Sequence, residues 1–180
     1  MQKSAKGRRR FGVVSGLVAL VTCSLLACAP APAPTPSPTP AFASEEAAFA
    51  AAEEVYRAYF EALGARIRGE SEPDPQVFLG GVALENDIDA QNSLLESGLV
   101  AIGEPVLTSF LGKETAINGQ IAGVTAHVCI DVSNLRVRDS SGLDVTPSDR
   151  GDVVAQLVQF SGDDERLLIT RETSTEEASC

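Results

Sequence analysis

The chain has 180 residues, enough for one domain of ordinary size but not for two. Five of its fourteen basic residues lie within the first ten positions, so the rest of the chain carries nine basic and 25 acidic side chains, a net charge of −16. Nucleic-acid phosphates and anionic lipid headgroups repel such a surface, which argues against a nucleic-acid partner and against electrostatic membrane binding.

The first 27 residues have the layout of a cleavable export signal. Residues 1–10 are cationic, and the 17 residues of Phe11–Ala27 are apolar. As a helix this apolar segment would extend about 25 Å, less than the roughly 30 Å of a bilayer core, which favours a cleaved signal over a permanent transmembrane helix. The run Arg8-Arg9-Arg10-Phe11 resembles a twin-arginine signal, but a basic segment of the general Sec route is favoured.

The segment Leu25-Leu26-Ala27-Cys28 resembles the lipobox of bacterial lipoproteins, in which a small residue precedes a cysteine. The resemblance implies that Cys28 receives a diacylglycerol and becomes the N-terminus, placing the protein on the outer face of the cell membrane. Two or three acyl chains give stable anchoring, at about 0.8 kcal/mol per buried methylene. Cys23 is a rival, but it follows Thr22, which fits the pattern poorly.

Residues 28–43 are predicted to form a linker between this lipid anchor and a folded domain. Proline alternates with small residues over Ala29–Ala41, a pattern that forbids helix and sheet and favours polyproline II. Twelve such residues reach about 37 Å, so the domain is expected to stand away from the membrane. Thr35, Ser37 and Thr39 are candidate positions for O-linked sugars, and an unmodified spacer is equally consistent with the sequence.

Residues 44–180 are predicted to form a single domain that begins with helices. Ser44 is a suitable N-cap, and Glu45 and Glu46 follow in the first turn, where the helix dipole favours acids. Gly64 is the expected end of this helix. Apolar residues recur at helical spacing and are interpreted as core rather than as pocket residues: Phe49, Ala52, Tyr56, Tyr59, Phe60 and Leu63.

Two further helices are expected before the strands begin. Asp74 and Pro75 are typical N-cap and first-turn residues of a short helix through Leu79, which Gly80-Gly81 would end. The apolar spacing from Leu84 to Leu95 predicts another helix to about Ser97, closed by Gly98.

After Gly98 the apolar period changes from helical to two. The clearest strand is Val124–Val132, in which apolar and polar residues alternate. Helices followed by successive antiparallel strands predict an α+β fold, with the helices packed on one face of a mainly antiparallel sheet of about four strands. The other expected strands are Val106–Leu111 and two hairpins, Leu135–Arg138 with Leu143–Val145 and Val153–Phe160 with Arg166–Arg171.

Processing would leave two cysteines in the mature chain, Cys129 and Cys180. An even pair in an oxidising compartment favours a disulfide. A disulfide that closes the loop between these two cysteines would stabilise the fold by about 4 kcal/mol in the chain-entropy model. The same bond would hold the C-terminal residue in place. The alternative is a buried thiol at Cys129 and a free thiol at Cys180.

Three segments resemble a family of small actinobacterial lipoproteins: Glu45–Tyr59, Val128–Ser133 and Val145–Arg150, followed by the cysteine at the C-terminus. The order of helices before sheet is also similar to the SnoaL-like, ketosteroid-isomerase-type cone fold. These resemblances imply a fold and a location in the cell envelope, but no activity and no catalytic residue.

No motif in the chain predicts a cofactor or a metal site, because Gly-rich phosphate loops, nucleophile elbows and His/Cys metal spacings are all missing. His127, Cys129 and Asp131 share one strand face and resemble a Cys-His-Asp set. Residues two apart on a strand are separated by about 6.5–7 Å, too far for the hydrogen bond between a nucleophile and its base. A structural role for these residues is therefore favoured.

Acidic residues gather in the last predicted helix, but they lack the turn glycine that an EF-hand calcium loop needs. We expect them to form a solvated helix face. They are Glu85, Asp87, Asp89 and Glu96.

These features favour a membrane-anchored domain that binds an unknown ligand or envelope protein without catalysis. The alternative is a small isomerase- or hydratase-like enzyme with a pocket between helices and sheet, which would need an ionisable group inside: Tyr56, Tyr59 or Asp131. A deep pocket lined by such a group would favour the enzyme, and a filled core would favour binding. The sequence does not distinguish an adhesive or envelope-organising role from this binding role.

Overall fold

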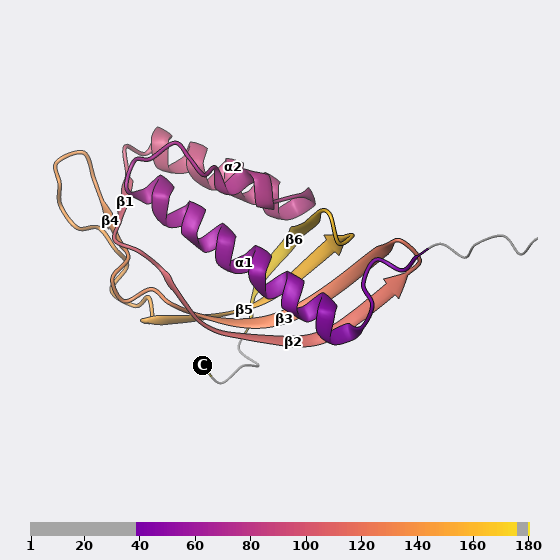
Figure 1. Ribbon diagram of the computed structural model, residues 1–180. Helices are drawn as coiled ribbons and strands as arrows, with labels where there is room; N and C mark the ends of the chain where they lie inside the picture. Colours follow the sequence, from indigo (N-terminus) through magenta and orange to yellow (C-terminus); the bar gives the residue numbers. More distant parts are fainter. Residues whose placement is uncertain (1–38, 176–179) are drawn as a thin grey trace, which may run out of the picture. The chain divides into compact units, whose positions relative to one another are not determined.

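The computed structural model describes residues 39–175 and residue 180 (Figure 1). The chain divides into two units, Met1–Pro36 and Ser37–Cys180, and the account below concerns the second. The predicted export signal, Cys28 and most of the linker lie outside the described residues. Within the described part of the chain, no helix is both long enough and apolar enough to span a membrane.

Three helical segments open the domain: α1 (Glu45–Ile67), the 3-10 turn η1 (Pro75–Phe78) and α2 (Gly81–Glu96). The two predicted side-chain caps are confirmed. The Ser44 hydroxyl accepts a hydrogen bond from the backbone N–H of Ala47, and the Asp74 carboxylate accepts one from that of Gln76.

The glycines behave differently from the sequence prediction. Gly64 lies inside α1, which continues one turn further because Ala65 is also buried and extends the packed face of the helix. Gly80-Gly81 begins α2 rather than ending η1. The backbone N–H of Gly80 donates to the carbonyl of Ile169, and Gly81 has a φ of 52°, which glycine adopts without strain.

The strands form a four-stranded antiparallel sheet in the order β2-β3-β5-β6. The prediction of an α+β fold with helices and a mainly antiparallel sheet is therefore confirmed. The strands are β2 (Val106–Asn118), β3 (Ile121–Asp131), β5 (Val153–Gly162) and β6 (Leu167–Ser174).

A second, two-stranded sheet joins β1 (Val100–Ile102) to β4 (Arg136–Arg138). The expected hairpin at residues 135–145 is present as an antiparallel bridge between Arg138 and Asp144, with backbone hydrogen bonds from Val145 to Val137 and from Asp139 to Leu143, although its second arm is not a strand. The main partner of β4 is instead β1, a pairing of distant segments that local sequence patterns do not reveal.

Both helices lie on one face of the four-stranded sheet: α1 crosses β2, β3 and β6, and α2 packs beside it against β6 (Figure 1). Alternate β3 residues from Ala122 to Ile130 are buried toward the helices. Aromatic rings fill the space between α1 and the sheet, with centroids 5.1–6.3 Å apart; they belong to Tyr56, Tyr59, Phe60, Phe110 and Phe160.

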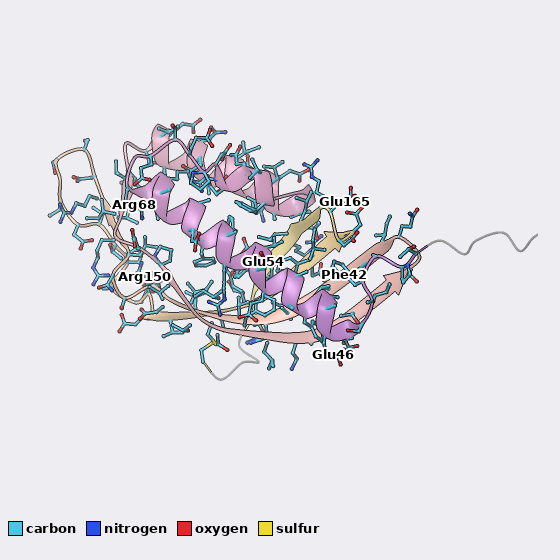
Figure 2. All side chains as sticks on the ribbon, viewed as in Figure 1. Phe42, Glu46, Glu54, Arg68, Arg150 and Glu165 are labelled. Atoms are coloured by element: carbon cyan, nitrogen blue, oxygen red, sulfur yellow. A yellow bond between two sulfur atoms is a disulfide. The ribbon has the colours of Figure 1, made fainter. Side chains whose placement is uncertain are left out.

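A disulfide joins Cys129 to Cys180, as the sequence predicts, with Cα atoms 5.7 Å apart. Cys129 alternates with the inward-facing Val128 and Ile130, so the disulfide lies on the sheet face opposite α1 (Figure 2). It attaches the last residue of the chain to a central strand.

A close approach of α1 to the sheet occurs at Gly112, in a bulged part of β2. A Cβ atom at this position would lie 2.3 Å from the Phe49 ring. We expect Gly112→Ala to lower the free energy of unfolding by about 1–3 kcal/mol, because the ring must move away. Urea unfolding of the variant and the parent protein measures this loss.

The matched control is Gly123→Ala on the adjacent strand, where the nearest heavy atom would be 4.0 Å from the new Cβ. This variant is expected to keep the parent stability. Equal stability of the two variants would show that Phe49 does not limit the packing of α1 on β2.

Candidate functional site

The interior beneath α1 contains a polar pair within the aromatic packing. Tyr56 is fully buried, and its hydroxyl donates a hydrogen bond to Glu172 Oε1 at 2.7 Å. The same hydroxyl lies 3.3 Å from Gln156 Oε1. The three side chains come from α1, β6 and β5, so the pair connects the helix to the two strands at this edge of the sheet.

Burial controls the protonation of this pair. It raises the pKa of Glu172, with a further increase from the nearby Asp87, while the hydrogen bond from Tyr56 opposes the shift. Burial also raises the pKa of Tyr56 and of Tyr59, and the charge of Glu172 adds to both shifts. Both phenols therefore remain hydrogen-bond donors, and Glu172 resists ionisation.

A second polar contact joins the two helices. The Arg66 guanidinium donates two hydrogen bonds to the Asp87 carboxylate, at 2.9 and 2.6 Å, and the Gln76 side-chain amide donates a third at 3.0 Å. Burial favours a higher pKa for Asp87, but the hydrogen bonds from Arg66 and Gln76 and the Arg66 charge outweigh it and lower that pKa.

The Asp87 side chain is only 9% exposed. The prediction of a fully solvated acidic face was wrong at this residue, whereas Glu85, Asp89 and Glu96 are exposed.

The residues His127, Cys129 and Asp131 do not form a catalytic set. Cys129 is bonded to Cys180 and offers no thiolate. Hydrogen bonding by the Ser133 side chain, and by its backbone N–H at 2.8 Å, lowers the pKa of the Asp131 carboxylate and ties it to a turn rather than to the interior. Of the three residues that an interior pocket would need, Tyr56 and Tyr59 point inward and Asp131 does not.

Sequence analysis missed Glu172 because a bulge reverses the alternation of β6. Ile169 pairs with Phe160 and faces the core, and strict alternation would then place Arg171 inside. The register shift between Gln159 and Phe160 instead leaves Arg171 exposed and turns Glu172 inward. No pattern within β6 marks this shift.

An apolar groove of about 400 Å³ lies where α1 and α2 end beside β1. Two side chains at its border are unusually exposed for their type: Leu95 is 77% exposed and Val100 is 58% exposed. The apolar residues that line it include Leu63, Leu94, Leu95, Leu99, Val100 and Leu135.

A second groove, between α1 and the start of β2, is more polar and has a volume of about 590 Å³. Its Arg68 is paired with Glu70 and Glu104, which satisfy the guanidinium from within the chain. Among the described residues, no group of three or more His, Cys, Asp or Glu side chains is placed to hold a metal ion.

Comparison with known proteins assigns no family. No family model matches the chain, and no curated protein is detectably similar to it. Among solved structures, the intermembrane space region of the chloroplast protein ARC6 aligns with a TM-score of 0.46 and 17% identity, over 70% of this chain and 95% of that one. A likeness at this level carries no inference about fold or function.

The partly buried Glu172 is expected to make a pH-dependent contribution to stability. Because folding raises its pKa above the ordinary value of 4.5, its contribution is fully present below that pH and is lost as the pH rises through the folded-state pKa. We therefore expect Glu172→Gln to become progressively more stable than the parent protein as the pH rises from 4 toward neutrality. Thermal or urea unfolding at successive pH values measures the difference.

Glu54→Gln, at an exposed position on α1, is the matched control for the loss of one carboxylate (Figure 2). A Glu172→Gln curve that runs parallel to the Glu54→Gln curve at every pH would show that Glu172 is not desolvated in the folded protein.

Proposed function

We propose that this chain is an exported bacterial lipoprotein, held on the outer face of the cell membrane by lipid on Cys28, whose domain binds a ligand or an envelope protein without catalysis. The lipobox-like segment Leu25-Leu26-Ala27-Cys28, after a cationic and an apolar segment, supports the anchor. The disulfide between Cys129 and Cys180 supports an oxidising compartment. The net charge of −16 beyond the first ten residues leaves lipid as the attraction to the membrane.

The filled interior is the observation that favours binding over catalysis. Five aromatic rings occupy the space between α1 and the sheet, and the largest fully buried side chains include Tyr56 and Phe160. A pocket for a substrate would have to displace this packing. Binding is then assigned to the outer surface of the domain.

We further propose that the domain has the SnoaL-like cone arrangement and belongs with the small actinobacterial lipoproteins that it resembles. Two helices on one face of an antiparallel four-stranded sheet support the cone. The Sec route is the favoured export path, with the twin-arginine route as the alternative suggested by Arg8-Arg9-Arg10-Phe11.

Metabolic labelling with an alkyne analogue of palmitate tests the anchor. The parent chain is expected to take up the label, and mass spectrometry of the membrane fraction is expected to find an N-terminal peptide that begins at diacylated Cys28. Cys28→Ser should abolish the labelling, because the diacylglyceryl group then has no thiol to attach to. Cys23→Ser is the control and should be labelled like the parent. Labelled Cys28→Ser protein, or a mature chain that keeps Met1, would contradict the anchor.

The pair of Tyr56 and Glu172 favours a second candidate, an isomerase- or hydratase-like enzyme. A buried carboxyl group with a raised pKa beside a phenol is a combination suited to general acid–base chemistry. The pair is enclosed by aromatic rings, and for that reason it ranks second.

Isomerisation and hydration of α,β-unsaturated ketones, followed by ultraviolet absorbance, test this candidate. The binding proposal expects no turnover by the parent chain. Turnover that disappears in Glu172→Gln and persists in Glu54→Gln would establish the enzyme instead.

A further inference from the structure

The exposed side of α2 combines apolar and acidic residues. The helix contains four acidic residues and no basic residue. Ile88 and Leu95 are 41% and 77% exposed, and their seven-residue spacing places them on one side of the helix. Leu95 and Val100 continue into the apolar groove at the ends of the two helices. We call Ile88, Leu95, Val100 and the groove lined by Leu63, Leu94 and Leu99 together the α2 surface.

We propose that the α2 surface docks a basic, amphipathic segment of another envelope protein, an inference that rests on the proposed binding function. The apolar side chains of the segment would enter the groove, whose volume of about 400 Å³ is within the usual range of roughly 300–1,000 Å³ for specific sites. An amphipathic helix that binds in an apolar groove presents its apolar side chains at positions i, i+3, i+4 and i+7.

Charge complementarity identifies the occupant as basic, because the one charged side chain among the described residues that line the groove, Arg66, is already bonded to Asp87. Three exposed carboxylates of α2 accompany the apolar residues, and within residues 39–175 no ion pair neutralises them: Glu85, Asp89 and Glu96. The groove also lies at the C-terminal ends of α1 and α2, where the partial negative charge of each helix dipole attracts cations.

The same charges disfavour other occupants. A second copy packed symmetrically would place its own acidic α2 against this one, and like charges at an interface are costly. An anionic lipid would bring its negative headgroup toward the same carboxylates, which would repel it. A neutral apolar molecule would fill the groove but make no use of the exposed acids of α2.

A model peptide tests the proposal on the full chain, reconstituted in nanodiscs of zwitterionic phosphatidylcholine. The probe is a fluorescein-labelled peptide of leucine and lysine, with leucines at positions i, i+3, i+4 and i+7. The reference is the same peptide with glutamate in place of lysine. Fluorescence anisotropy is expected to show that the lysine peptide binds at least about tenfold more tightly, after subtraction of binding to empty nanodiscs.

Two sets of variants locate the binding. Leu95→Ser/Val100→Ser is expected to weaken binding of the lysine peptide by about tenfold or more. Ile121→Ser changes a similarly exposed residue of the β2–β3 hairpin and should leave the binding unchanged. Asp89→Asn/Glu96→Gln should weaken binding by about threefold at low salt and reduce its salt dependence.

Three results would overturn the docking proposal. The first is equal binding by the Leu95/Val100 and Ile121 variants, and the second is equal binding of the two peptides. The third is a concentration-dependent dimer that the Leu95/Val100 variant abolishes, which would assign the surface to a second copy. Each of these leaves palmitate labelling at Cys28 unaffected, while loss of that labelling with peptide binding intact would refute the anchor alone.

Discussion

The packing of one side chain, Tyr56, connects the main parts of this domain. Its ring is fully buried and contacts the rings of Phe60, Phe110 and Phe160, so that α1, β2 and β5 share one aromatic cluster. Its hydroxyl must find a partner in this interior, and it finds one in Glu172 of the edge strand β6. The helix is therefore held on the sheet by ring packing and a buried hydrogen bond at the same residue.

This arrangement constrains the polar groups around it. Glu172 is partly buried, and the nearby Arg66 guanidinium is already bonded to Asp87. Burial therefore raises the pKa of this carboxyl group, and the hydrogen bond from Tyr56 only partly opposes the shift. A shifted pKa of this kind is a consequence of how the core closes, and structural networks produce it as readily as active sites do.

The elements with strong local patterns were predictable from the sequence. The cap at Ser44, the alternation along β3 and the pairing of Cys129 with Cys180 all follow from short-range chemistry or from counting. Features that depend on distant partners were not predictable: the pairing of β1 with β4, and the β6 bulge that turns Glu172 inward. In each case the deciding contact joins segments whose own sequences favour no particular outcome.

The closed interior also bears on where specificity can reside. A domain whose core is occupied by aromatic rings has its outer surface left for recognition, and beyond the first ten residues the chain carries 25 acidic and nine basic side chains. An acidic surface alone attracts many cations weakly. An apolar groove on the same surface also selects a partner by the shape of its apolar side chains. The exposed Leu95 and Val100 supply that second requirement at the end of α2. Under the docking proposal, a partner that meets both conditions would be discriminated from polycations and from anionic lipids by the same small region.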